Sequence, residues 1–226
     1  DEQVEDCISK IGISSRFLLS LINDILDMSR IESGKMLLKN EKIPTEDFLN
    51  GINSICYAQA AARGVDYECI VDPVLDDYYM GDAMKLQQVL INILSNAIKF
   101  TKEGGKVTLS AALRRKTKND AVLRFIVNDT GIGISEEFIP HIFEPFSQES
   151  TGTTAPYGGS GLGLAISKNI VDMMDGKINV RSIKGIGTEF TVDVKLGITE
   201  EEKLRHNKRK SVRSEERRVG KECRSR

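Results

Sequence analysis

The most informative part of the sequence is residues 88–101, Gln88-Val-Leu-Ile-Asn92-Ile-Leu-Ser-Asn96-Ala-Ile-Lys99-Phe100-Thr101. At about 100° per residue, its polar side chains share one helix face and its apolar side chains share the other. Asparagine forms helices poorly, so Asn92 and Asn96 inside a helix need a reason. One amide oxygen per turn can ligate a hard cation, and Lys99, one turn further on, can meet a phosphate. From composition alone, this face is either a functional site or an ordinary solvated surface.

A second pattern, Asp129-Thr130-Gly131-Ile132-Gly133, follows the apolar strand predicted over 123–127. A carboxylate at a strand end, followed by glycines that let backbone approach closely, suits an acceptor for an exocyclic amine. By itself the pattern also describes many tight turns.

A third pattern is rich in glycine and reads Gly158-Gly159-Ser160-Gly161-Leu162-Gly163-Leu164. It leads into an apolar helix, and the free N–H groups of a helix N-terminus bind anions. A glycine hinge is the structural alternative. A fourth pattern, Gly185-Ile186-Gly187-Thr188, reads by itself as a plain turn. The P-loop, the Rossmann fingerprint, G-x-S-x-G and H-E-x-x-H are all absent from the sequence.

From residue 35 onward, strand and helix patterns alternate, which predicts an α+β sandwich of a sheet covered by helices. Thr45 and Asp82 are predicted helix N-caps, and Gly64 a helix stop. The predicted strands cover 36–38, 67–71, 106–114, 122–128, 177–183 and 188–194, and the predicted helices 45–63, 82–100, a short one from Ser135, and 162–174, with a loop over 147–159.

Apolar residues spaced by three, four and seven predict one long amphipathic helix over 1–33, ending at Gly34. Such a helix cannot bury its apolar stripe alone. The near-heptad spacing favours a two- or four-helix bundle, and an ordinary core helix is the alternative.

The chain has 226 residues, 40% of them apolar, and a formal net charge of -1, which argues against a nucleic-acid-binding protein. Residues 206–226 hold nine Lys/Arg, three Glu and little that is apolar, so we expect a disordered tail, and its last stretch, 214–226, resembles translated vector sequence. A nucleic-acid or membrane-surface tail is the alternative. The four cysteines form no C-x-x-C pair, and no apolar run could span a bilayer, so a cytoplasmic setting is expected.

The four patterns, in this order, resemble the catalytic ATP-binding domain of sensor histidine kinases, a branch of the Bergerat-fold superfamily. Residues 88–101 resemble its N box, 129–134 its G1 box, 159–164 its G2 box and 185–188 its G3 box. Residues 142–148, Ile-Phe-Glu-Pro-Phe146-Ser-Gln, resemble its F box, and 17–34 the second helix of its dimerisation hairpin. The resemblance implies a Bergerat two-layer sandwich over 35–197, preceded by a partial hairpin over 1–34 and followed by a tail over 198–226.

The resemblance also implies residue roles. Asn96 would ligate Mg²⁺, with Asn92 and Lys99 beside the ATP polyphosphate. Asp129 would accept from the adenine amine, and residues 143–157 would form a mobile lid. The remaining implied nucleotide-binding residues are Gly131, Gly133, Phe146, Gly159, Gly161, Leu162, Gly163 and Thr188.

The γ-phosphoryl of this family goes to a His on the first hairpin helix and then to a response-regulator receiver domain. The chain has only His141 and His206, and neither has that context, so we expect a fragment that lacks its acceptor helix and cannot autophosphorylate. Lys85 stands where the family often has Arg, a change expected to alter a phosphate-side or lid contact. The parent is expected to be a homodimer of the hybrid type, with membrane attachment open. The alternatives are a non-catalytic dimerisation or regulatory module and a Bergerat ATPase, the latter weakened by Asn92 where that branch carries a Glu.

Overall fold

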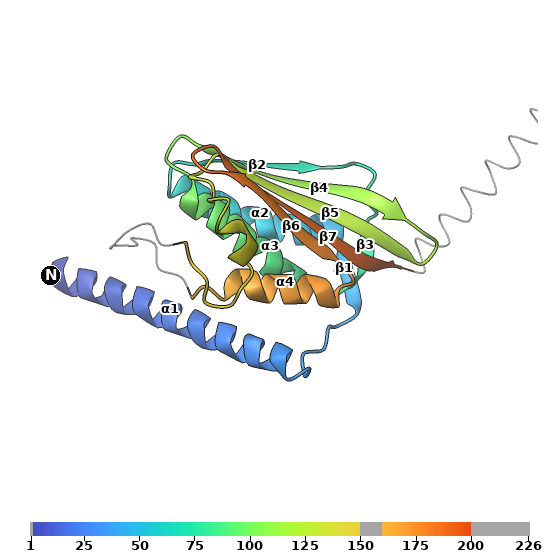
Figure 1. Cartoon of the computed structure of the whole chain (residues 1–226), viewed down its shortest axis with the longest axis horizontal. Coiled ribbons are helices and arrows are strands. Elements are labelled where there is room, and N and C mark those ends of the chain that lie inside the picture. Colours follow the sequence, from blue (N-terminus) through green and yellow to red (C-terminus); the bar gives the residue numbers. More distant parts are fainter. Residues whose placement is uncertain (1, 150–159, 200–226) are drawn as a thin grey trace, which may run out of the picture.

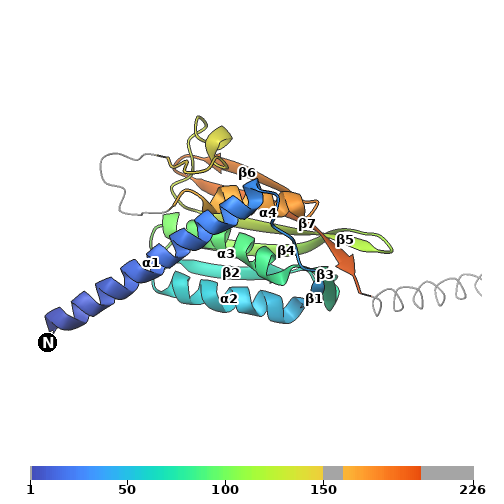
Figure 2. The same cartoon turned by 90° about the horizontal axis from the view of Figure 1, so that it is seen from below.

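A seven-stranded mixed sheet lies on three helices, and a long fourth helix crosses below them (Figures 1 and 2). The computed structural model describes residues 2–149 and 160–199. The elements are α1 (Glu2–Glu32), β1 (Glu41–Pro44), α2 (Thr45–Ala61), β2 (Asp66–Val71), β3 (Tyr78–Gly81), α3 (Ala83–Phe100), β4 (Lys106–Lys116), β5 (Asp120–Asp129), the 3-10 helix η1 (Ile139–His141), α4 (Gly163–Met173), β6 (Lys177–Ile183) and β7 (Gly187–Ile198).

The core fills the space between the sheet and the helices because both layers bury one face. Along β5 every second side chain is buried, as the two-residue period of a strand requires. The apolar face of α3 is buried from Leu86 to Ile98, as predicted. Complete burial of one such aliphatic side chain is worth about 1.5–3 kcal/mol, so this face holds α3 firmly against the sheet.

The sheet order is β1-β3-β7-β5-β4-β2, with β6 paired to β7. Only β2 and β4 run parallel. The register of the central pair sets Asp129, the last residue of β5, opposite Thr188 on β7. Two patterns that lie 59 residues apart in the sequence therefore meet at one end of the sheet.

Helix α1 meets the rest of the chain through its C-terminal half, where it crosses α3 and α4 (Figure 2). Asp27 accepts from Lys85 Nζ at 2.8 Å and from Gln88 Nε2 at 2.9 Å, and Asp24 accepts from Ser160 Oγ at 2.9 Å. Burial acts to raise the pKa of Asp27, but the hydrogen bonds from Lys85 and Gln88 outweigh it and lower the pKa. Lys85 therefore pairs with α1, and the phosphate-side or lid contact expected for it stays a prediction.

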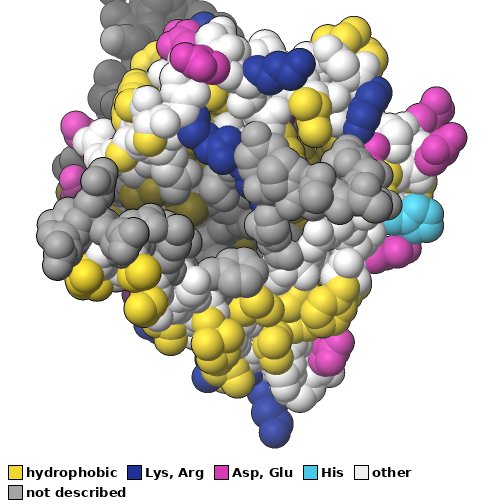
Figure 3. Space-filling view, turned by 90° about the vertical axis from the view of Figure 1, so that its left-hand side faces the viewer, with side chains coloured by type: hydrophobic (Ala, Val, Ile, Leu, Met, Phe, Trp, Pro, Cys, Tyr) yellow, Lys and Arg dark blue, Asp and Glu magenta, His cyan; other side chains and the backbone are white. Residues whose placement is uncertain are grey.

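The remaining surface of α1 exposes large apolar side chains, and Figure 3 shows hydrophobic side chains gathered along the lower edge of this end of the molecule. The exposed residues are Val4, Ile8, Ile11, Leu18, Leu19, Ile22, Ile25 and Leu26. The described part of the chain leaves this stripe uncovered. That the helix pairs with another helix stays a prediction.

Most long elements were predicted correctly, and the short ones account for the errors. Residues 36–38 are not a strand. The backbone N–H groups of Lys35 and Met36 both donate to Arg30 O, and these hydrogen bonds form a turn at the end of α1. The first strand is β1, and both β1 and β3 were missed because each has only four residues.

Two predicted helix starts were also wrong. Pro44, not Thr45, is the N-cap of α2, and the Thr45 hydroxyl donates to Asp76 O at 2.7 Å. No helix begins at Ser135, where turns lead into the three residues of η1. By contrast, Asp82 caps α3 as predicted and accepts from Lys85 N at 2.9 Å.

Several predictions fall outside the described residues, namely residues 150–157 of the lid, Gly159, the basic tail from 200 and His206. Within residues 2–149 and 160–199, none of the helices is long and apolar enough to cross a membrane.

Candidate nucleotide-binding site

Asp129 lies half-buried at the end of β5, and backbone groups hold its carboxylate. Gly131 N donates to Asp129 Oδ1 at 2.9 Å, and the backbone N–H of Thr188 also hydrogen-bonds to the carboxylate. Burial raises the pKa of Asp129, and these two hydrogen bonds oppose the shift. The result is a desolvated, oriented acceptor, which suits an amine donor.

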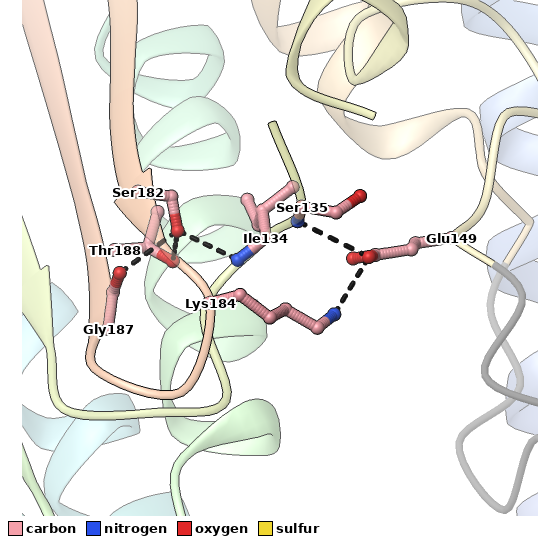
Figure 4. Close-up of polar contacts among 7 residues, drawn as sticks. All are labelled: Ile134, Ser135, Glu149, Ser182, Lys184, Gly187 and Thr188. Atoms are coloured by element: carbon pink, nitrogen blue, oxygen red, sulfur yellow. Dashed lines mark hydrogen bonds and ion pairs between the residues drawn. The ribbon is translucent and has the colours of Figure 1, made fainter. Parts of the chain in front are cut away.

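The loop after Asp129 fits closely against the β6–β7 hairpin. Gly185 N donates to Ile132 O at 2.7 Å, and Ile134 N donates to Ser182 Oγ at 2.8 Å (Figure 4). Gly133 has φ +62°, and a Cβ there would lie 2.1 Å from Ile183 O. Only glycine therefore fits at this position, which explains the second glycine of the G1 pattern.

The polar face of α3 meets the start of α4. Asn92 Nδ2 donates to Ser167 Oγ at 2.9 Å, and a Cβ on Gly163 would lie 2.4 Å from Asn92 Oδ1. Asn96 follows one turn later on the same half-buried face. The sequence did not point to Ser167, whose hydroxyl is 1% exposed and fixes the Asn92 amide.

The N-terminus of α4 keeps backbone donors available. The N-cap residue, Leu162, makes no side-chain capping hydrogen bond, and the first N–H groups of a helix have no intrahelical acceptor. Leu162 is 0% exposed, and its N–H already donates to Ser160 Oγ at 3.2 Å, so the predicted contact of this residue with a nucleotide stays a prediction. This helix end can hold an anion.

Lys99 lies half-buried in the last turn of α3. Burial, with a smaller contribution from the charge of Arg63, lowers its pKa. Arg63 Nη1 also donates to Lys99 O at 2.8 Å, which satisfies a carbonyl at the helix end.

Residues of the F box lie beside the glycine-rich segment. Phe146 N donates to Gly161 O at 3.0 Å, while the Phe146 side chain is 68% exposed. Glu149 accepts from Ser135 N at 3.3 Å and from Lys184 Nζ at 2.7 Å (Figure 4). Hydrogen bonds from Lys184 and Ser135 outweigh the effect of burial, which acts to raise the pKa of Glu149, and lower it.

His141 and the described cysteines add no second reactive centre to this site. His141 is exposed on η1, and its Nδ1 lies 2.9 Å from Glu144 Oε1, which agrees with a surface residue. Burial raises the pKa of the Cys56 thiol to about 11. Among residues 2–149 and 160–199, no group of three or more His, Cys, Asp or Glu side chains could hold a metal.

The fold and the site define a class, and comparison with known proteins identifies it. The family model described as Histidine kinase-, DNA gyrase B-, and HSP90-like ATPase matches residues 81–198. The chain therefore belongs to this family, as the order of its motifs predicted.

The relatives are sensor kinases. The chain is 39% identical over 198 residues to the sensor protein GacS of Pseudomonas syringae pv. syringae, covering 88% of the chain and 22% of GacS. It is 41% identical over 194 residues to the autoinducer 2 sensor kinase/phosphatase LuxQ of Vibrio parahaemolyticus, covering 84% of the chain and 22% of LuxQ. The chain thus spans about a fifth of these relatives.

A solved structure confirms the architecture. Full-length ShkA in complex with AMPPNP superposes with a TM-score of 0.72 and 29% identity, covering 86% of this chain and 39% of that one. The predicted α+β fold and the predicted likeness to histidine kinase catalytic domains are both confirmed.

Proposed function

We propose that residues 35–197 bind Mg-ATP and position its γ-phosphoryl group for transfer to a histidine outside this chain. The observation that carries the proposal is the meeting of three parts at one end of the sheet, namely Asp129 with Thr188, the polar face of α3, and the uncapped start of α4. Family membership and the AMPPNP bound by the similar ShkA support it.

At the base end, Asp129 binds the 6-amino group of adenine. Two backbone donors already orient its carboxylate, so accepting a third hydrogen bond requires little reorganisation of the site. The G1 loop packs against the hairpin and keeps this carboxylate in place.

At the phosphate end, the backbone N–H groups at the start of α4 and the ammonium of Lys99 bind the polyphosphate. Phosphoryl transfer needs mainly positioning and charge neutralisation from the protein. Asn92, fixed by Ser167, holds α3 and α4 at the spacing that both contacts require. The exposed Phe146 and its contact with Gly161 lie where a lid would close over the nucleotide.

Asn96 fits the role of the Mg²⁺ ligand by the chemistry of its donor. Magnesium takes oxygen ligands, keeps several waters and uses few protein side chains when it binds with a nucleotide. An amide oxygen on the polar face of α3 meets that need, and the described residues offer no acidic cluster as a rival. The bound ion would neutralise charge that develops on the phosphates.

We further propose that residues 1–34 are the second helix of a dimerisation hairpin, with the exposed stripe of α1 facing the other helices of a homodimer. The accepting histidine would stand on the first helix of that hairpin, and the phosphoryl group would pass to an Asp of a response-regulator receiver domain. The uncovered apolar side chains of α1 support this assignment.

Calorimetric titration with ATP, with and without Mg²⁺, tests the binding proposal. We expect binding that depends on Mg²⁺ and is lost in Asn96→Ala and in Asp129→Ala, while both variants stay folded by circular dichroism. Absence of binding by the folded chain would favour a non-catalytic module, and steady phosphate release would favour an ATPase.

Incubation with γ-labelled ATP tests the catalytic step. We expect no acid-labile phosphohistidine on the chain alone, because His141 is an exposed residue paired with Glu144 and lies on no hairpin helix. Addition of an acceptor hairpin from a related kinase should produce labelled acceptor. Labelled histidine on the isolated chain would contradict the proposal.

A further inference from the structure

Ser182, on β6 and outside every motif found in the sequence, joins the G1 loop to the β6–β7 hairpin. Its Oγ accepts from Ile134 N at 2.8 Å and donates to Gly187 O at 2.9 Å, and it lies 2.9 Å from Thr188 Oγ1 (Figure 4). One hydroxyl therefore touches both glycine motifs of the adenine end.

Hydrogen-bond accounting fixes the direction of the third contact. A serine hydroxyl has one proton and two lone pairs. The proton goes to Gly187 O, and Ile134 N uses one lone pair. The remaining lone pair can only accept, so Thr188 Oγ1 is the donor to Ser182 Oγ.

Because Thr188 Oγ1 is the donor in this contact, the hydroxyl of Thr188 can only accept a hydrogen bond from a ligand. Its hydroxyl proton is used by Ser182, and its backbone N–H is used by the Asp129 carboxylate. Thr188 is 8% exposed, so bulk water cannot readily reorganise these bonds. Asp129 and Thr188 together then present acceptors only.

An acceptor-only pair discriminates between purines. The 6-amino group of adenine donates hydrogen bonds, whereas O6 of guanine accepts them and would face two acceptors. A site built to pair with one polar group rejects a ligand that lacks it, because its own buried groups are left unpaired.

We propose that Ser182 is a positioning residue that determines base specificity: by taking the Thr188 hydroxyl proton, it keeps the Asp129–Thr188 pair an acceptor of the 6-amino group. The inference rests on the proposed ATP binding. The neighbouring contact of Lys184 with Glu149 braces the same loop without touching Thr188, so it supplies a matched control (Figure 4).

The experiment compares dissociation constants for ATP, for purine riboside triphosphate, which is ATP without the 6-amino group, and for GTP, all measured calorimetrically with Mg²⁺. In Ser182→Ala, ATP binding should weaken about tenfold, as for loss of one buried hydrogen-bond partner. Purine riboside triphosphate should change less than about twofold, and the preference for ATP over GTP should shrink by about the same tenfold factor. Ser182→Thr should restore the preference, and Lys184→Ala should leave it unchanged.

Thr188→Val provides a second route that keeps the side-chain shape, should Ser182→Ala not fold. It should lower the preference for the amine-bearing nucleotide to the same extent, and the double variant should be no worse than either single one. Equal weakening of all three nucleotides in Ser182→Ala, or the same loss of preference in Lys184→Ala, would overturn the specificity role and leave a purely structural one. An unchanged preference in variants of a chain that binds ATP would overturn this inference alone, whereas a wild-type chain that binds no ATP would overturn the proposed function as well.

Discussion

Replacement of Gly163 by alanine should destabilise the protein through a clash with Asn92. The added Cβ would lie 2.4 Å from Asn92 Oδ1 and 2.9 Å from both Cγ and Nδ2. Asn92 cannot withdraw freely, because its Nδ2 donates to the buried Ser167 hydroxyl. Overpacking of this kind costs about 1–3 kcal/mol. Loss of the Asn92–Ser167 hydrogen bond would add about 0.5–1.5 kcal/mol.

Alanine also has the better helix propensity, by up to about 1 kcal/mol, so the expected net loss in unfolding free energy is about 0.5–4.5 kcal/mol. For a protein of this size, each kcal/mol lowers the melting temperature by about 2–4 °C. Thermal unfolding followed by far-UV circular dichroism measures the change. Gly51→Ala in α2 is the matched control, because a Cβ there meets no atom within 4 Å, and it should stabilise slightly.

A double-variant cycle separates the clash from general damage. Asn92→Ala removes the amide that obstructs the new methyl group, so Gly163→Ala with Asn92→Ala should be at least about 1 kcal/mol more stable than the sum of the single effects. Additive effects, or a Gly163→Ala variant that behaves like Gly51→Ala, would refute the contact between α3 and α4 as described.

Four further predictions concern charged groups. Asp129→Asn keeps the shape but replaces a charged acceptor, so ATP affinity measured by calorimetry should fall about 10- to 100-fold with the fold intact by circular dichroism; an unchanged affinity would remove Asp129 from the site. Because burial raises the pKa of Asp129, ATP affinity should begin to fall on acidification at a higher pH than for an ordinary aspartate, and Asp129→Asn should abolish that dependence. The same raised pKa means that this carboxyl favours the folded state most at low pH and that its contribution is lost as the pH rises through the folded-state pKa, which a pH series of unfolding curves will show. Lys85→Met removes the ammonium group that pairs with the Asp27 carboxylate, so amide hydrogen exchange in the C-terminal half of α1 should speed up. The control is Lys168→Met, which should have no such effect because its partner Asp172 is exposed. Equal exchange in both variants would show that Lys85 does not hold α1.

Long periodic elements were predictable because burial repeats along them. The apolar face of α3 recurs over five turns, and burial alternates along β5 from Asp120 to Val127, so each pattern repeats often enough to be recognised. Residues 36–38 and the stretch from Ser135 are too short for such averaging. There the backbone conformation is set by particular hydrogen bonds instead, such as those that Arg30 O accepts at the end of α1.

The candidate site divides in the same way. Its glycines could be recognised because close approach permits no other residue, as at Gly133. No sequence pattern points to Ser167, Ser182 or Arg63, since serine and arginine are common on any surface. Their roles arise only from partners that lie far away in the sequence, namely Asn92, Ile134 and the last turn of α3.

Periodicity and glycine spacing are local properties of the chain, so they were enough to predict the α+β layers and the motifs, whose order resembles that of the histidine kinase family. Which side chains meet depends on the tertiary packing. The register of β5 against β7 brings Asp129 to Thr188, and the packing of α4 on α3 brings Gly163 to Asn92. The packing of α1 likewise gives Lys85 its partner, Asp27, because hydrogen bonds depend on distance in space rather than along the chain.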